Sequence, residues 1–167
     1  IPMPGSAASA IAVSGTVRDY LQRHYPQLPA ARIQVIQRGV DPMAFPYGYQ
    51  PSATWRADWF QRYPQLQTAP VLTLPGRLSR LKGHADFIEL IARLRARGLP
   101  VHGLIVGGVE PRRQRYADQL RWKVRSLGLA DAILFTGHRA DMREIYAVST
   151  LVLSLSAQPE SFGRTIL

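Results

Sequence analysis

Short apolar runs alternate with amphipathic stretches along most of this chain, and the alternation sets the expected fold. Strands are predicted at residues 10–13, 32–36, 71–74, 101–106, 132–135 and 150–155. Helices with apolar positions on one face are predicted at residues 17–24, 54–63, 84–97, 112–127 and 141–147. Repeated strand-helix units favour an α/β fold, with a doubly wound parallel sheet, helices on both faces and right-handed crossovers.

Local signals mark several element boundaries. Gly98 and Gly128 each follow a predicted helix, as is usual at a helix C-terminus. Asp141 and Glu144 have the spacing of a capping box and predict the start of a short helix. The aromatic stripe in 54–63 predicts a helix that packs on the domain, rather than a base-stacking surface. The run Leu151-Val152-Leu153 predicts a buried strand.

The size of the chain sets the first bounds on what it is. Its 167 residues, 46% hydrophobic, suffice for one domain, or one domain plus a piece of another. No cysteine is present, so disulfides and thiolate sites are excluded, and no apolar run approaches the ~18 residues of a membrane span. The start, Ile1-Pro2-Met3-Pro4-Gly5, has neither an initiator methionine nor the pattern of a signal peptide. We therefore expect a fragment of a larger protein.

The charge balance points to an anionic partner. There are 21 Lys and Arg against 11 Asp and Glu, a formal net charge of +10. Such a balance suits nucleic acid, an anionic membrane surface or a phosphorylated small molecule. A solvated basic surface is the alternative. The arginines are scattered, apart from a small cluster at Arg112, Arg113 and Arg115.

Glycines and polar residues gather in the loops that follow the predicted strands, at one edge of the sheet. In the loop Gly76–Gly83, Arg77 and Lys82 form a candidate diphosphate site, with arginine as a bidentate fork and lysine as a point charge. Two exposed loop cations are the alternative interpretation. The loop is not a Walker A motif, because Gly-Lys-Ser/Thr is absent.

The later loops carry weaker signals. Gly107 could let a nucleotide approach the backbone, or simply make a turn. Gly137, His138 and Arg139 could offer backbone groups to a base, or form an ordinary strand-to-helix turn. Glu160 could bind sugar hydroxyls or start a helix. No Gly-x-Gly-x-x-Gly follows a strand, which argues against a nicotinamide or flavin enzyme, and the four histidines lack metal-site spacing.

Taken together, these stretches resemble the retaining GT-B glycosyltransferases of group 1 (family 4), from about residue 32 to the end of the chain. Four pieces carry the resemblance, and they are residues 33–41, residues 76–83, Leu104-Ile105-Val106-Gly107 with Phe135-Thr136-Gly137, and Pro159-Glu160-Ser161-Phe162-Gly163. One departure is Gln37-Arg38, where the family usually has Pro-Asn before Gly39.

The resemblance implies roles for particular residues. Arg77 and Lys82 match the positions that hold the donor diphosphate in place of a metal ion, and Glu160 matches the first glutamate of an E-x7-E motif that contacts the transferred sugar. The second glutamate would fall at position 168, and the chain ends at Leu167. Donor contacts are also expected in the neighbouring loops, at Gly76, Gly107, Gly137, His138, Arg139, Ser161, Phe162 and Gly163.

The resemblance also implies an organisation and a function. Residues 1–41 would be the tail of an N-terminal acceptor domain with its linker, and residues 42–167 an incomplete Rossmann-like donor domain. The reaction would be transfer of a hexose-type sugar with retention, from a UDP- or GDP-linked donor to a glycan or lipid-linked acceptor, without a metal. Glycan, lipopolysaccharide or glycolipid synthesis, and a cytoplasmic location with peripheral membrane association, are expected by analogy.

Two other classes of function stay open at this point. The chain could be a non-catalytic module that binds a nucleotide or a sugar phosphate, or a basic nucleic-acid-binding domain. The transferase interpretation does not expect nucleic acid as a partner, and it expects the isolated chain to be inactive, because acceptor-activating residues would belong to the N-terminal domain.

Overall fold

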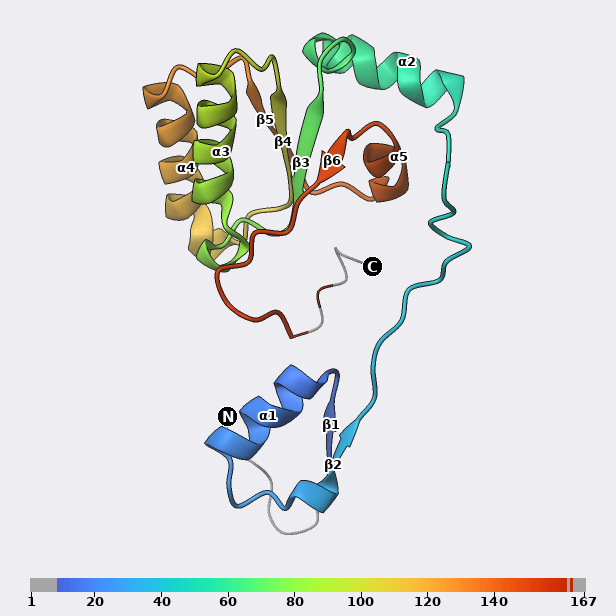
Figure 1. Cartoon of the computed structure of the whole chain (residues 1–167), viewed down its shortest axis with the longest axis vertical. Helices are drawn as coiled ribbons and strands as arrows, with labels where there is room; N and C mark the ends of the chain where they lie inside the picture. Colours follow the sequence, from blue (N-terminus) through green and yellow to red (C-terminus); the bar gives the residue numbers. More distant parts are fainter. Residues whose placement is uncertain (1–8, 162, 164–167) are drawn as a thin grey trace. The chain divides into compact units, whose positions relative to one another are not determined.

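The computed structural model describes residues 9–161 and residue 163 of the chain (Figure 1). These residues form two compact units. The larger unit is Pro42–Ala157, and the smaller one combines the described residues of 1–41 and 158–167. The assignment of 1–41 to an acceptor domain and of 42–167 to a donor domain stays a prediction.

The smaller unit is built on a two-stranded parallel sheet of β1 (Ala10–Ala12) and β2 (Ile33–Val35). Between them run helix α1 (Gly15–His24) and the 3-10 turn η1 (Ala30–Arg32). The strands and the helix confirm the pattern seen in the sequence. Three buried residues form a small core, and they are Ala12, Leu28 and Ile33.

The larger unit contains a four-stranded parallel sheet with the order β5-β4-β3-β6. Its strands are β3 (Val71–Pro75), β4 (His102–Val106), β5 (Ile133–Gly137) and β6 (Leu151–Val152). Its helices are α2 (Ala53–Arg62), α3 (His84–Ala96), α4 (Gln114–Ser126) and α5 (Met142–Ala147). Short 3-10 turns add η2 (Pro64–Leu66), η3 (Arg80–Lys82) and η4 (Pro111–Arg113). The predicted α/β fold is thereby confirmed.

Helices cover both faces of this sheet (Figure 1). Side chains of α3 and α4, such as Phe87 and Leu120, pack on one face against Leu74 and Ile105. On the other face, Trp59 of α2 and Ile145 of α5 pack against residues that include Leu104. Because neighbouring side chains on a strand point to opposite faces, one apolar strand serves both cores. Among the described helices, none is both long and apolar enough to cross a bilayer.

Two expectations were wrong in this unit. The segment 150–155 is not a buried strand, because β6 spans only two residues and Leu151 is 52% exposed. Its place at the sheet edge, paired only with β3, explains that exposure. The helix after Asp141 is confirmed as α5, but its capping box is not. Asp141 makes no side-chain capping bond, since its carboxylate is engaged elsewhere.

Gly83 lies where η3 meets α3, and the fold needs a glycine there. Its φ of 70° is in the left-handed region. A Cβ added at Gly83 would lie 2.1 Å from the carbonyl oxygen of Leu155. The segment after β6 therefore passes directly against the start of α3, and this approach leaves no room for a side chain.

We expect Gly83→Ala to cost roughly 3 kcal/mol of unfolding free energy, from left-handed strain plus steric overlap. Gly128→Ala is the matched control, because Gly128 has a φ of 66° but nothing within 4 Å of an added Cβ. It should cost only about 1–2 kcal/mol. Urea unfolding followed by tryptophan fluorescence measures both. An equal loss of unfolding free energy in the two variants would show that the close approach to Leu155 does not contribute to the cost.

Candidate functional site

The loops after β3 and β4 meet through their backbones at the carboxyl edge of the sheet. Gly76 N donates to the carbonyl of Val106 at 2.8 Å, and Leu78 N donates to the carbonyl of Gly108 at 3.1 Å. A Cβ at Gly107 would lie 1.9 Å from the carbonyl oxygen of Gly76. The two loops are thus in direct backbone contact, which requires the glycine.

Arg77 extends from this junction toward solvent. Its side chain is 76% exposed and forms an ion pair with Glu110, which lies in the loop after β4. Glu110 pairs at the same time with Arg113, whose Nε lies 3.0 Å from Glu110 Oε2. Because exposed pairs contribute little to stability, the Arg77 pair sets orientation more than fold.

Lys82 comes from the same loop as Arg77 and lies over Gly76. Its Cγ and Cδ lie 3.4 Å from the position that a Cβ on Gly76 would occupy. Gly76 has a φ of 149°, which also disfavours any other residue there. The structure therefore places both predicted cations on one short loop, with Gly76 directly beneath the lysine.

His84 anchors the end of this loop from inside the domain. The residue is fully buried, and its Nδ1 lies 3.3 Å from the carbonyl oxygen of Ser79. Burial lowers the pKa of His84, against the opposing effect of its hydrogen bonds to the backbone of Ser79 and Gly76. A neutral ring at this position avoids adding a buried charge next to Lys82.

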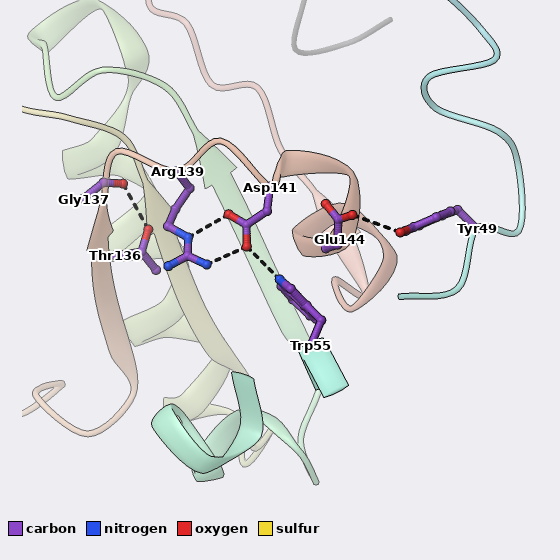
Figure 2. A network of polar contacts seen from close by, with 7 residues as sticks. All are labelled: Tyr49, Trp55, Thr136, Gly137, Arg139, Asp141 and Glu144. Carbon is purple, nitrogen blue, oxygen red and sulfur yellow. Dashed lines mark hydrogen bonds and ion pairs between the residues drawn. The ribbon is translucent and has the colours of Figure 1, made fainter. Parts of the chain in front are cut away.

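The loop after β5 lies at the same edge. Gly137 has a φ of 74° and ends the strand, and Thr136 Oγ1 donates to its carbonyl at 3.2 Å (Figure 2). The Cβ of His138 lies 3.5 Å from where a Cβ on Gly108 would be. The glycines and polar residues of three successive loops are therefore brought together, as the sequence pattern predicted.

The Arg139 side chain is held by contacts within the domain, whereas Gly137 and His138 are exposed. Its Nε donates to Asp141 Oδ1 at 2.8 Å, while Asp141 Oδ2 accepts from Trp55 Nε1 at 2.8 Å (Figure 2). The guanidinium also lies 5.5 Å from the ring centre of Trp59. Its charge is satisfied within the domain, and its assignment as a donor contact stays a prediction. The same carboxylate is why Asp141 does not cap α5.

A separate hydrogen bond connects the segment before α2 to helix α5. Tyr49 donates its hydroxyl to Glu144 Oε1 at 2.9 Å (Figure 2). Hydrogen bonding to Glu144 is the main cause that raises the pKa of Tyr49. Glu144 therefore binds a residue from outside its own helix, instead of reaching back to the helix start.

Three of the residues predicted at the site, Glu160, Ser161 and Gly163, belong to the smaller unit. Glu160 is half-buried and Ser161 is exposed, and the Ser161 carbonyl accepts a hydrogen bond from the hydroxyl of Ser14. Phe162 and residues 164–167, where the first turn of a helix was predicted, lie outside the described residues. The roles of these residues at a donor sugar stay predictions.

Sequence reasoning missed Glu110 and His84. Glu110 stands three residues after Gly107, in a loop already expected at the functional edge, and that position was the available signal. No local pattern marked His84, because only the packed structure shows that it is fully buried. Within the described residues, no group of three or more His, Asp or Glu could hold a metal ion.

Residues 56–167 match the family model of glycosyl transferases group 1. The chain belongs to this family. The match covers α2 from Arg56 onward and the whole of the four-stranded sheet with the loops at its carboxyl edge. Arg77 and Lys82 therefore lie within the part of the chain that matches the family.

Solved structures of other glycosyltransferases have the same fold. A glycosyltransferase from Rickettsia africae is 26% identical with a TM-score of 0.80, covering 95% of this chain and 41% of that one. HepE of Anabaena, in complex with UDP and glucose, is 27% identical with a TM-score of 0.81, covering 96% and 41%. WaaG, a glycosyltransferase involved in lipopolysaccharide biosynthesis, is 23% identical with a TM-score of 0.72, covering 94% and 40%.

These comparisons confirm the predicted Rossmann-like GT-B fold and the interpretation of the chain as part of such a protein. The chain spans about 41% of the length of the first two structures. No curated protein matches the chain.

We expect Asp141→Asn to lower the unfolding free energy by about 1–3 kcal/mol at neutral pH, because Arg139 loses its half-buried partner. Hydrogen bonds from Arg139, with Trp55 contributing, lower the pKa of Asp141 below its ordinary 3.8. The stabilisation is therefore complete above pH 3.8 and is lost as the pH falls through the folded-state pKa.

Urea unfolding from neutral pH to about pH 3 measures the difference between the two proteins, which should shrink at the acid end. Asp131→Asn is the control, since Asp131 is exposed. A loss that stayed constant across this range would show that the ionised carboxylate is not its source.

Proposed function

We propose that this chain supplies the donor-binding part of a retaining hexosyltransferase of family 4 that uses a nucleotide-diphosphate sugar. The observation that carries the proposal is the loop between β3 and α3, which places Arg77 and Lys82 together beside Gly76 and Gly107. The crystallised relative HepE, of similar fold, was solved with UDP and with glucose. UDP is accordingly the first donor nucleotide to test, with GDP next.

The chemistry follows from the charge that develops in sugar transfer. When the bond from the sugar to the diphosphate breaks, negative charge grows on the leaving diphosphate. Two fixed cations stabilise this charge, and they do so most effectively if they are already in position. Arg77 offers a planar pair of donors, while Lys82 offers a compact charge over Gly76. The absence of a metal requirement is part of this proposal.

Glu110 gives Arg77 a defined resting partner. The ion pair orients the guanidinium near the loop edge, and an incoming diphosphate competes with the carboxylate for it. Such competition has a cost in affinity, but the pair is exposed and therefore weak. A doubly charged diphosphate is the stronger partner for an arginine fork.

The remaining parts of the proposal concern the parent protein. Glu160 would contact the transferred sugar, and the acceptor would be a glycan or a lipid-linked glycan in glycan, lipopolysaccharide or glycolipid synthesis. A peripheral position on the cytoplasmic face of a membrane and the absence of a nucleic-acid partner belong to the same proposal. A chain of this length should not turn over by itself.

We expect Arg77→Ala and Lys82→Ala each to weaken UDP binding about tenfold or more, because each removes a charge-assisted contact with the diphosphate. Uridine, which has no phosphate, should bind both variants as it binds the unmodified chain. Titration calorimetry with UDP, GDP, ADP and uridine measures these affinities.

Arg97→Ala is the matched control, since Arg97 is an exposed arginine at the end of α3, away from the loop. It should leave UDP affinity within about twofold, as expected for a distant, screened charge. Normal UDP binding by both loop variants would remove the basis of the diphosphate assignment. Transfer activity of the 167-residue chain alone would contradict its dependence on a second domain.

A further inference from the structure

A groove rich in arginine lies between η3, in the second half of the predicted diphosphate loop, and the start of α4. It has a volume of about 650 Å³. Four arginines line it, and they are Arg80, Arg112, Arg113 and Arg115. Tyr116 and Gln119 also line the groove, and none of its lining residues is acidic. This concentration of charge is what the sequence showed only as a small cluster.

Two of these arginines have partners that fix their position. Arg80 donates to Gln119 Oε1 at 3.3 Å, and its guanidinium lies 5.2 Å from the ring centre of Tyr116. Arg113 pairs with Glu110 at 3.0 Å. The groove wall is therefore partly ordered before any ligand binds, which reduces the entropy lost on binding.

Arg112 and Arg115 differ from them. Both are exposed, and within the described part of the chain neither side chain forms a hydrogen bond or an ion pair. Four guanidinium groups around one groove raise a positive potential that a single shared carboxylate does not cancel. An anion with several oxygen acceptors would relieve this repulsion, and phosphate matches the donor geometry of arginine.

We propose that this groove binds a phosphate-bearing ligand, at a site separate from the diphosphate position at Arg77 and Lys82. The site takes its specificity from Arg112 and Arg115, with Arg80 and Arg113 already in place. The shared chemistry is a phosphate ester, which a lipid headgroup or a soluble phosphorylated compound can provide.

Glu110 connects this groove to the predicted donor site. One carboxylate pairs with Arg77 on one side and with Arg113 on the other. When a donor diphosphate engages Arg77, Glu110 is left to neutralise Arg113, which lowers the charge of the groove. The two anions therefore oppose each other's binding, and the effect is reciprocal. This coupling rests on the proposed donor function, whereas the groove site does not.

Two exposed apolar side chains at or near the groove favour testing a lipid headgroup as the source of the phosphate ester. Leu81 lines the groove and is 49% exposed. Trp122 is 65% exposed and lines an adjoining hollow together with Arg115, Asp118 and Gln119. Tryptophan beside arginine is a common arrangement where proteins contact the headgroup region of an anionic membrane.

Titration calorimetry of the 167-residue chain with inorganic pyrophosphate tests the groove. The double variant Arg112→Ala/Arg115→Ala should weaken the groove's affinity about tenfold or more. Arg97→Ala/Arg125→Ala removes the same charge from exposed positions outside the groove. This control should change the pyrophosphate affinity of the groove by less than about threefold. Arg77→Ala/Lys82→Ala should retain the groove's binding of pyrophosphate.

The proposal is overturned if the groove variant and the charge-matched control bind alike, or if Arg77→Ala/Lys82→Ala abolishes all pyrophosphate binding. UDP binding by the unmodified chain is measured separately, so failure of the donor function leaves the groove result intact. Where UDP binds, saturating UDP should weaken pyrophosphate at the groove severalfold, and Glu110→Gln should remove that effect.

Vesicles of phosphatidylcholine with and without phosphatidylglycerol separate the two sources. Binding that needs phosphatidylglycerol and is lost in Arg112→Ala/Arg115→Ala identifies a lipid headgroup. Binding of pyrophosphate with no binding to either vesicle identifies a soluble phosphate ester. A chain that binds neither pyrophosphate nor phosphatidylglycerol vesicles contradicts the proposal.

Discussion

The backbone contact between Gly76 and Gly107 is the constraint on which the functional edge of the larger unit depends. A Cβ at Gly107 would lie 1.9 Å from the carbonyl oxygen of Gly76, so any side chain there would push the loops after β3 and β4 apart. Because these loops meet, Arg77 from one reaches Glu110 from the other. A similar approach of Gly83 to Leu155 fixes the other end of the Arg77 loop. Two glycines thus decide where the cations can be.

A shortage of acidic residues shapes the electrostatics around this edge. With 11 Asp and Glu for 21 Lys and Arg, several carboxylates serve two partners. Glu110 pairs with Arg77 and Arg113, and Asp141 binds Arg139 and Trp55. Other arginines also have carboxylate partners, such as Arg121 with Asp118, but Arg112 and Arg115, where η4 leads into α4, form no ion pair within the described residues. Part of the net charge of +10 is therefore concentrated locally, where four arginines line one groove.

Much of the fold could be predicted, because apolar periodicity reports burial directly. The strands at β3, β4 and β5 and the helices α3 and α4 follow from it, and so does the gathering of loops at one edge. The pattern misled where burial depended on partners that a local window cannot contain. An apolar run predicted β6 as buried, but its place at the sheet edge leaves Leu151 exposed. Likewise Asp141 and Glu144 have capping spacing, yet long-range partners at Trp55 and Tyr49 take both carboxylates.

The same reasoning separates two arginines that look alike in the sequence. Arg77 and Arg139 each follow a strand and a glycine, and both were candidates for donor contacts. Arg139 is only 23% exposed, pairs with a carboxylate of similar burial and stacks near Trp59, so releasing it would leave Asp141 poorly solvated and unpaired. Arg77 is 76% exposed, and its carboxylate keeps Arg113 when it leaves. The lower cost of freeing Arg77 makes it the arginine that can change partner when an anion arrives, whereas Arg139 is better suited to hold the loop after β5 in place.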